Sequence, residues 1–458
     1  MYKNRIKILT LVLFLLFHIQ AFAINKQSEY LWGNIIGGKS FERFNDIKQT
    51  DDLGFIVVGH TNSYDFSTNF YGTYGDFDAL LLKYNESGNL EWIKKFGGEA
   101  FDTFNSVNVC KDGGFIVSGF TKSKYGDIGN GNVKDEDGLV VKFDSRGNIE
   151  WKTTFGGSRS ERFTNAIPIS NGYLVIGYSN SEDGDLSGLN KGEYDGIVIK
   201  LDREGNIEWK SSFGGSRWDK FYSAIEVTGG YIVVGYTESK DKDLKGLKIL
   251  GQEGIIVKYD TDGKVLWSKS FGGDGDDDIF SICKIEDGFV IVGKTNSSDK
   301  DFESQRYYGN YDAFISRLDF NGNVKWTRTF GGSEEDVFTS LFNKNDYGLV
   351  VVGYTESKDG ELEGLNSGNM DALTVKYDLD GNLIWKNVYG KDGDDIFSSA
   401  VYCDFYGFVA VGYTTSKQLN VKGNEDCLMT KFEEQRIKVS AIYFSENNKV
   451  LKREKQQN

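Results

Sequence analysis

Carboxylates recur at two fixed positions along this chain, and rings or pairs of carboxylates can bind cations or transfer protons. The first position lies four residues after a Gly-rich step and is acidic in all seven units: Glu42, Asp102, Glu161, Asp219, Asp277, Asp336 and Asp395. We expect these acids to ring one mouth of a central channel. They would bind a cation on the axis or each hydrogen-bond the turn beside it, and repetition in every unit favours the second role.

The second acidic position opens the third predicted strand of each unit: Asp78, Asp137, Asp195, Glu253, Asp312, Asp371 and Asp426. A basic residue follows five positions later: Lys83, Lys142, Lys200, Lys258, Arg317, Lys376 and Lys431. An odd separation puts the two on opposite faces of a strand. Each base must therefore meet a carboxylate elsewhere, and the regular spacing predicts ion pairs between neighbouring units.

Oxygen-bearing side chains alternate in the long segment between the second and third predicted strands: Asp183, Asp185 and Ser187; Asp241 and Asp243; Asp299 and Asp301. Spacing by two before a Gly resembles the start of a calcium loop, because Ca²⁺ takes six to eight oxygen ligands around a turn. Tyr194 stands where such a loop ends in a bidentate Glu. Calcium is therefore a possible cofactor, and a solvated Asp-rich turn is the alternative.

Aromatic and basic side chains gather in the same long segments and just after the Gly steps. The candidates for a ligand-binding surface are Tyr71, Tyr74, Trp218, Arg306, Tyr307, Tyr308 and Tyr311. Exposed rings beside acids and amides suit a glycan or a protein surface. The alternative is that these rings only cover their own loops.

Histidine chemistry is nearly absent from the sequence. After residue 23 the chain holds one histidine, His60, at a position where five of the other units carry Phe or Tyr. His60 therefore looks like a packing residue, which excludes Ser-His-Asp and Cys-His catalysis and His-based metal sites. We expect no catalytic residue. A carboxylate-based glycan-cleaving enzyme is the alternative, as is a purely structural surface or periplasmic protein.

The elements that position these residues follow from a repeated phrase, which runs Asp-Arg-Glu-Gly-Asn-Ile-Glu-Trp-Lys-Ser-Ser-Phe-Gly-Gly over residues 202–215. Its Trp recurs every 58 to 60 residues, at Trp32, Trp92, Trp151, Trp209, Trp267, Trp326 and Trp385. One unit predicts strands at 163–169, 173–179, 195–202 and 207–213, with apolar β-branched runs and Gly turns between them. Seven such units predict an all-β, seven-bladed propeller of four-stranded antiparallel blades.

The two ends of the repeat complement each other. The seventh unit has three predicted strands, and the stretch around Trp32 matches only a fourth strand. The N-terminal strand should therefore complete the last blade and remove its open edge. This places the propeller at residues 24–435 and leaves 436–458 as a C-terminal tail. Cys110, Cys283, Cys403 and Cys427 are too far apart in this arrangement to pair, so we expect buried free thiols.

Residues 1–23 read as a secretory signal peptide. Lys3, Arg5 and Lys7 precede an apolar run that is too short to span a bilayer, and Ala21-Phe22-Ala23 has the form of a cleavage site. We expect cleavage after Ala23 and a secreted, cell-surface or periplasmic protein with no transmembrane segment. The net charge of −15 argues against nucleic acid as a partner. The expected product is a monomer that binds a glycan or a protein surface.

The stretch 184–216, which contains the Trp phrase, resembles the repeats of secreted bacterial β-propeller proteins. It is also distantly similar to the Trp-docking repeats of quinoprotein propellers, in which an Asp, a Gly turn and a Trp link the third and fourth strands. The resemblance covers Tyr30 to Phe432 and implies the propeller fold. It carries no quinone cofactor, because seven blades and the absence of adjacent cysteines depart from that pattern.

Overall fold

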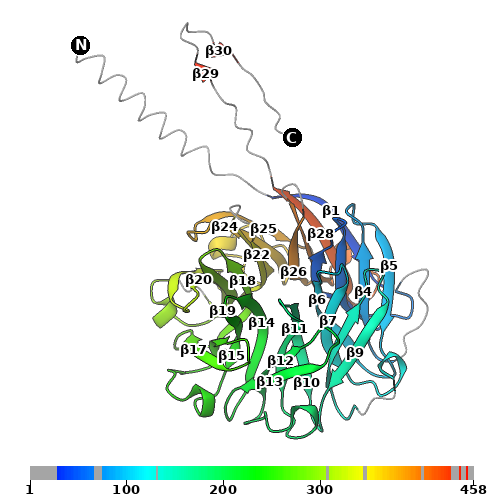
Figure 1. Cartoon of the computed structure of the whole chain (residues 1–458). Helices are drawn as coiled ribbons and strands as arrows, with labels where there is room; N and C mark the ends of the chain where they lie inside the picture. The colour runs from blue at the N-terminus through cyan, green and yellow to red at the C-terminus, as the bar shows by residue number, and fades with distance from the viewer. Residues whose placement is uncertain are drawn as a thin grey trace.

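Seven four-stranded antiparallel sheets stand around a central channel (Figure 1). This is a computed structural model, and it describes residues 28–66, 75–129, 133–305, 309–343, 348–403, 407–434, 443–444 and 450–451. The sheets confirm the predicted seven-bladed propeller. The predicted signal peptide at 1–23 lies outside the described residues. In the predicted tail, β29 (Tyr443–Phe444) pairs with β30 (Val450–Leu451) in a sheet of their own.

Blades one to six each use four consecutive strands. Blades one and two are β2 (Glu42–Gln49), β3 (Phe55–Thr61), β4 (Asp78–Tyr84), β5 (Leu90–Phe96), and β6 (Asp102–Val109), β7 (Phe115–Thr121), β8 (Asp137–Phe143), β9 (Ile149–Phe155). Blades three and four are β10 (Glu161–Pro168), β11 (Tyr173–Ser179), β12 (Asp195–Leu201), β13 (Ile207–Phe213), and β14 (Asp219–Val227), β15 (Gly230–Thr237), β16 (Glu253–Tyr259), β17 (Val265–Phe271). Blades five and six are β18 (Asp277–Ile285), β19 (Gly288–Thr295), β20 (Asp312–Asp319), β21 (Val324–Phe330), and β22 (Asp336–Asn343), β23 (Leu349–Thr355), β24 (Asp371–Tyr377), β25 (Leu383–Tyr389).

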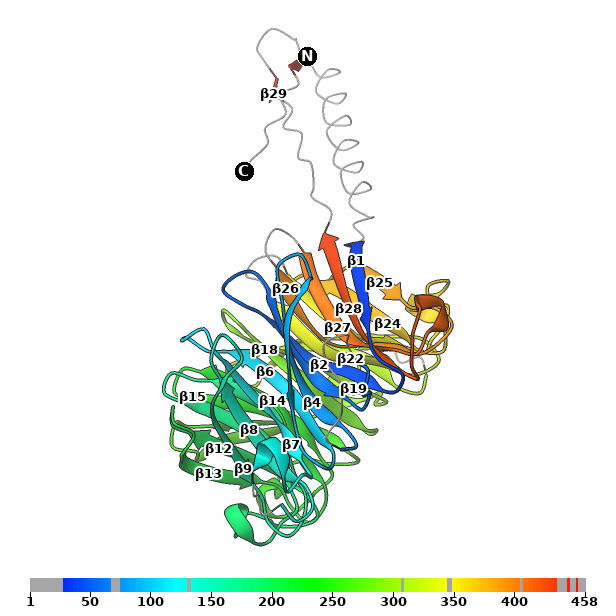
Figure 2. The same cartoon turned by 90° about the vertical axis from the view of Figure 1, so that its right-hand side faces the viewer.

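Blade seven is shared between the two ends of the chain. It contains β26 (Asp395–Cys403), β27 (Gly407–Thr414), β28 (Asp426–Glu434) and the N-terminal β1 (Ser28–Ile36). Strand β1 runs antiparallel to β28 with Trp32 opposite Lys431, and Figures 1 and 2 show the two strands side by side. The predicted closure by the N-terminal strand is therefore confirmed.

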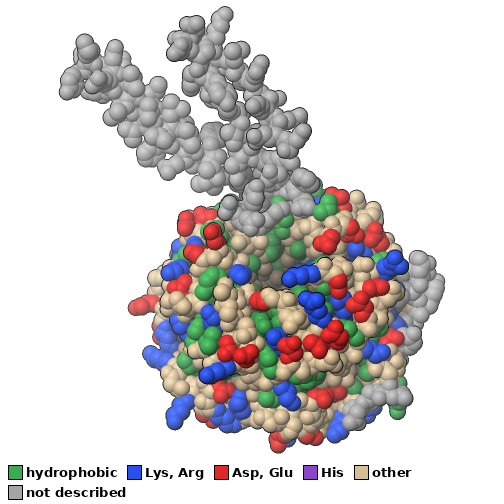
Figure 3. Space-filling model, in the orientation of Figure 1, with side chains coloured by type: hydrophobic (Ala, Val, Ile, Leu, Met, Phe, Trp, Pro, Cys, Tyr) green, Lys and Arg blue, Asp and Glu red, His purple; other side chains and the backbone are tan. Residues whose placement is uncertain are grey.

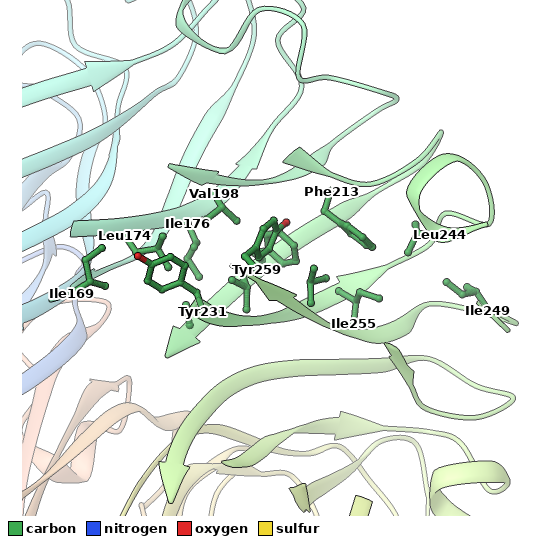
Figure 4. Packing of buried hydrophobic residues seen from close by; sticks show 14 residues of the cluster. Ile169, Leu174, Ile176, Val198, Phe213, Tyr231, Leu244, Ile249, Ile255 and Tyr259 are labelled. Carbon is green, nitrogen blue, oxygen red and sulfur yellow. The ribbon is translucent and has the colours of Figure 1, made fainter. Parts of the chain in front are cut away.

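The core lies between blades rather than inside any one of them. In blade three every residue of β11 but Tyr178 is buried, as expected of a middle strand covered on both faces. One cluster joins Ile176 and Val198 of blade three to Tyr231 and Ile255 of blade four (Figure 4). Each blade thus buries its apolar face only against its neighbours, and the ring must close to complete the core.

The repeated Trp docks each blade on the next. The Trp209 indole Nε1 donates a hydrogen bond of 3.0 Å to the carbonyl oxygen of Thr261, in the turn between the third and fourth strands of blade four. The same 3.0 Å bond links Trp151 to Arg203. The turn Gly263 has a φ of +81°, and a Cβ there would lie 2.5 Å from the Trp209 ring, so both backbone and packing require Gly. Hence the phrase repeats because it forms the joint between blades.

The two faces of the ring differ in their connections. Links between blades and the long loops between second and third strands emerge on one face, which we call the long-loop face. These loops contain η1 (Gly126–Ile128), η2 (Gly184–Leu186), η3 (Lys242–Leu244), η4 (Lys300–Phe302), η6 (Gly360–Leu362) and η7 (Lys417–Leu419). Hairpins and tight turns make the opposite, short-turn face. Across the part of the chain that the structure describes, no helix has the length and apolarity to cross a membrane.

All four cysteines are free, as predicted. Cys110, Cys403 and Cys427 are buried, whereas Cys283 is only half-buried. Burial raises the pKa of the Cys110 thiol to about 11. These thiols therefore pack as small apolar groups.

Candidate functional site

The seven acids of the first repeated position, Glu42 to Asp395, are called the fixed acids below. They lie buried beside the channel mouth on the long-loop face, each at most 2% exposed. Asp219 is typical. Its Oδ2 accepts hydrogen bonds of 2.7 Å from the Gly215 amide and from the Ser239 hydroxyl. In blade three, Glu161 Oε2 accepts the equivalent bond from the Gly157 amide at 2.9 Å, and its Oε1 accepts one of 2.7 Å from the Ser179 hydroxyl. Asp219 Oδ1 likewise accepts a hydrogen bond from the Thr237 hydroxyl. Each acid thus caps the link that enters its own blade.

The hydroxyl partners of these acids form a second repeated motif, which the sequence reasoning missed. Every second strand ends in Ser or Thr, followed two residues later by Ser: 61/63, 121/123, 179/181, 237/239, 295/297, 355/357 and 414/416. All these side chains are buried. Their fixed distance from the acid, 18 to 21 residues, was the signal that could have revealed them.

A second buried carboxylate faces each fixed acid across a glycine. A Cβ built on Gly214 would lie 2.2 Å from Asp195 Oδ1 and 2.7 Å from Asp219 Oδ2, so no side chain fits between them. Burial, with a smaller contribution from the charge of Asp195, raises the pKa of Asp219 to about 6 against the hydrogen bonds that lower it. Asp277 reaches about 7 for the same reason, with Glu253 as its neighbour. These junctions hold acids that titrate near neutrality.

The alternating loop acids also cap the links between blades. Asp183 Oδ1 accepts a hydrogen bond of 2.6 Å from the Ser158 amide, and Asp185 Oδ2 accepts one of 3.1 Å from the Gly156 amide. Blade four repeats this arrangement with Asp241 on Ser216 at 2.8 Å and Asp243 on Gly214 at 3.1 Å. The two acids of a loop therefore bind different amides rather than a common centre.

Blade five keeps part of the same scheme. Asp301 Oδ2 accepts a 3.0 Å bond from the Gly272 amide, while Asp299 lies against Gly273. Ser187 is exposed, and its amide closes η2 on the Gly184 carbonyl. Within the described segments, no three His, Cys, Asp or Glu side chains are grouped to hold a metal ion. Calcium binding at these loops stays a prediction.

The basic residues on the third strands do not form the predicted ion pairs between blades. Lys142 Nζ lies 2.8 Å from both Asp112 in the hairpin and Glu150 on the fourth strand of its own blade. Lys200 pairs with Glu208, again inside one blade. The predicted pairing between blades is therefore wrong, because the hairpin and the outer strand bring carboxylates closer than the next blade does.

The predicted ligand-binding residues are only partly described. Tyr71, Tyr74, Arg306, Tyr307 and Tyr308 lie outside the described residues. Trp218 is 39% exposed at the end of the link into blade four. Tyr311 is half-buried at the junction between blades five and six, and its hydroxyl donates a 3.2 Å hydrogen bond to Asp276. Both lie on the long-loop face, next to fixed acids.

Trp218 belongs to a cluster of rings around one ammonium group, which we call the rim cluster: Tyr178, Tyr194, Trp218, Lys220 and Tyr236. The Lys220 Nζ lies 4.5 Å from the Trp218 ring and 4.6 Å from the Tyr178 ring, with Tyr194 and Tyr236 within 5.8 Å. Burial lowers the pKa of Lys220. Cation–π contact thus holds an aromatic surface in place, with Trp218 as its exposed part.

The side chains at these positions differ between several junctions, although Arg43 with Glu425 over Tyr413 repeats the arrangement of Arg162 with Glu136 over Phe120. Arg162 forms two hydrogen bonds with Glu136, of 2.6 and 2.7 Å, and covers the Phe120 ring. Lys294 lies 3.2 Å from Glu335 and 4.3 Å from the Tyr311 ring centre. Figure 3 shows the opposite, short-turn face, on which acidic and basic side chains are interspersed around a hollow at the centre of the ring. The side chains of the long-loop rim repeat less regularly than the acids beneath them.

His60 belongs to the apolar part of this rim. Its ring packs against Phe77 and Phe101 at 5.4 and 5.7 Å, and its Nδ1 lies 3.0 Å from the Thr103 hydroxyl. Burial, together with the charge of Arg43, lowers the pKa of His60 to about 3. The side chain is therefore neutral at physiological pH, as a packing residue would be.

Comparison with known proteins gives one curated relative and several solved structures. No protein-family model matches this chain. It is 24% identical over 355 residues to the regulatory protein FlaEY of Caulobacter vibrioides, an alignment that covers 70% of this chain. The chain spans only 37% of the length of that relative.

Two solved structures align with most of the chain at low identity. BamB from Moraxella catarrhalis is 11% identical with a TM-score of 0.43, and the alignment covers 89% of this chain and all of that one. Sqt1 from Chaetomium thermophilum is 10% identical with a TM-score of 0.42 and the same coverage.

Proposed function

We propose that this chain is an exported, non-catalytic binding propeller that holds a glycan or a protein surface on its long-loop face. The proposed contact area is the channel rim around the rim cluster. Export is part of the proposal and rests on the form of residues 1–23.

One observation carries the proposal, namely the contrast between neighbouring positions at the channel mouth. The fixed acid is Asp or Glu in every blade. The residue after it differs between blades: Arg43, Thr103, Arg162, Lys220, Asp278, Val337 and Ile396. A position that only had to build the fold would repeat, as the acids and the Trp phrase do. Arg43 is exposed and Arg162 and Lys220 are half-buried, whereas Thr103, Asp278, Val337 and Ile396 are buried. Variation at one position of a repeated scaffold, with accessible side chains in blades one, three and four, suits a specific binding surface on that part of the rim.

The chemistry of the rim cluster suits recognition. Rigid rings give large contact areas at a small entropy cost, and the partly exposed Trp218 can stack on a sugar face or an apolar side chain. Acids and amides nearby, such as Asp278 with Gln252 at 2.6 Å, supply hydrogen-bonding groups. The name of the curated relative, a regulatory protein, is compatible with action through binding.

A carboxylate-based glycosidase is less well supported. Such an enzyme needs two carboxyl groups about 5 to 10 Å apart that reach the sugar. The fixed acids are at most 2% exposed and already accept hydrogen bonds from the links between blades. They therefore serve the scaffold rather than a substrate.

The test is a glycan array probed with the mature protein, followed by titration of each hit with tryptophan fluorescence as the readout. We expect saturable binding that Trp218→Ala abolishes. Tyr125→Ala is the matched control, because Tyr125 is 63% exposed in the long loop of blade two and should not affect binding.

Two results would overturn the glycan form of the proposal. One is an array without hits, which would leave a protein surface as the ligand class and move the test to peptide arrays. The other is a hit whose affinity Trp218→Ala leaves unchanged, which would place the site away from the rim cluster.

A further inference from the structure

A cavity of about 490 Å³ opens on the short-turn face, opposite the proposed binding rim. Its wall combines the hairpins of blades three and four with the ends of nearby strands. The residues that matter are Ser170, Asn171, Lys200, Glu226, Thr228 and Lys284. The volume falls within the roughly 300 to 1,000 Å³ that small-molecule sites occupy.

A local departure from the repeat explains why the cavity is open. In blades one, two and five a hairpin acid covers the strand-three base: Asp52 reaches Lys83 at 2.9 Å, Asp112 reaches Lys142 at 2.8 Å, and Asp287 reaches Arg317 at 2.8 Å. The hairpins of blades three and four read Ser170-Asn171-Gly172 and Thr228-Gly229-Gly230, without an acid. Lys200 keeps the strand-four partner, Glu208 at 2.8 Å, but has lost the hairpin acid.

The same hairpins leave room beside this base. A Cβ built on Gly229 would meet no atom within 4 Å, so the tip of the blade-four hairpin borders open space. The side chain of Asn171 replaces a carboxylate with a neutral amide. In blades one, two and five the hairpin acid neutralises the strand-three base, whereas the corresponding hairpin position near Lys200 carries no charge.

The cavity lacks one carboxylate that the corresponding base has in other blades, and this vacancy suits an anion. Lys284 is exposed, and its Nζ makes one long hydrogen bond, 3.3 Å, to the Glu226 carbonyl oxygen. The Glu226 carboxylate accepts a 3.1 Å bond from the Ser170 amide, which ties it to the hairpin. Two ammonium groups therefore stand against two carboxylates, Glu208 on Lys200 and Glu226 beside Lys284, whereas Lys142 in blade two pairs with two carboxylates by itself, at 2.8 Å each. At physiological salt, screening over about 8 Å lets these local charges outweigh the distant ones.

We propose that this cavity binds a small carboxylate ligand that also carries hydroxyl groups, of the kind an acidic monosaccharide presents. The ligand carboxylate occupies the place of the missing hairpin acid, between Lys200 and Lys284. Its hydroxyl groups exchange hydrogen bonds with Ser170, Asn171 and Thr228. The site is independent of the rim cluster, because it lies on the other face of the ring.

The test is an NMR or calorimetric titration of the mature protein with glucuronate, with glucose as the neutral match. We expect saturable binding of glucuronate that weakens as salt is added, and no saturable binding of glucose. Lys284→Gln should weaken glucuronate binding about tenfold, since it removes one charge-assisted hydrogen bond. Glu226→Gln should strengthen it, because it removes the one acid in the wall.

The control is Lys111→Gln, which removes an exposed lysine from the blade-two hairpin on the same face, away from the cavity. It should leave glucuronate binding unchanged. The proposal falls if glucuronate shows no saturation, if glucose binds as well, or if Lys284→Gln and Lys111→Gln have equal effects. The melting temperature of each variant separates loss of binding from loss of fold.

Discussion

Asp195 and Asp219 face each other across Gly214, one from the third strand of blade three and the other from the first strand of blade four. Both are buried, and a carboxylate pair of this kind occurs at each junction. Two buried acids at such close range share the penalty of desolvation and of like charge. The joints of the propeller are therefore weakest when both members of a pair are ionised.

Acidification should stabilise the protein. Burial raises the pKa to about 6 in Asp102 and Asp336 and to about 7 in Asp137 and Asp277, above an unfolded value near 4. The folded state therefore takes up protons between about pH 8 and pH 5 that the unfolded state does not, so stability rises as pH falls through this window. Melting temperatures at pH 8, 7, 6 and 5 should increase in that order. A series that stays flat or decreases would show that these buried acids do not have raised pKa values.

Asp219→Asn gives the matched variant for this effect. Asn is nearly isosteric and cannot ionise, so the variant should melt with a smaller pH dependence than the parent. An unchanged slope would mean that the pair at Gly214 does not titrate in this range.

Removal of one docking Trp should weaken the ring. Trp209→Ala loses a half-buried ring and the hydrogen bond to Thr261, and we expect a loss of about 3 kcal/mol of unfolding free energy. Trp218→Ala, the same change at a 39% exposed ring outside the docking phrase, should cost less than about 1 kcal/mol. Denaturant midpoints of the two variants provide the comparison, and equal shifts would contradict a special role for the phrase.

Deletion of the N-terminal strand should open the ring. Without residues 28–36, strand β28 exposes an unpaired edge, and such edges pair with other chains. We expect a lower melting temperature and association that increases with concentration in size-exclusion chromatography. A synthetic peptide of residues 28–36 should restore the monomer, whereas a scrambled peptide should not; restoration by both would argue against specific pairing.

Metal removal should have no effect on the described loops. Asp183, Asp185, Asp241 and Asp243 each accept a hydrogen bond from a backbone amide, and a bound cation would have to compete with these bonds. The melting temperature in EDTA should therefore equal that in millimolar CaCl₂. A rise with Ca²⁺ that Asp183→Asn abolishes would establish the calcium site that the spacing suggests, since a ligand of the folded state stabilises it by mass action.

The fold could be predicted from the sequence because every level of the chain agrees with it. The Trp interval gave the blade length, alternation and Gly turns gave the strands, and the mismatched ends predicted how β1 meets β28. The pairing of Lys142 was mispredicted because spacing along one strand says nothing about which neighbouring segment bends toward it. That depends on the hairpin carrying Asp112, whose reach is a tertiary property.

The candidate site was predictable only in outline. Aromatic rings on the long-loop face could be inferred for Trp218 and Tyr311, since they depart from the repeat, but only Trp218 is exposed. Lys220 gave no such signal, because a single lysine after an acid looks like a solvated charge until the rings around it are placed in space. The short-turn cavity was missed for a similar reason. It is open because Asn171 stands where other hairpins have an acid, and the importance of that acid is clear only from the ion pairs that it forms in the other blades.

The pairing of β1 with β28 also bears on how the protein is made. A ribosome releases β1 before β28, so β1 waits without its partner while the blades between them form. A chain that stops early never receives that partner and keeps an open edge. Completion of the ring thus requires that synthesis has passed β28.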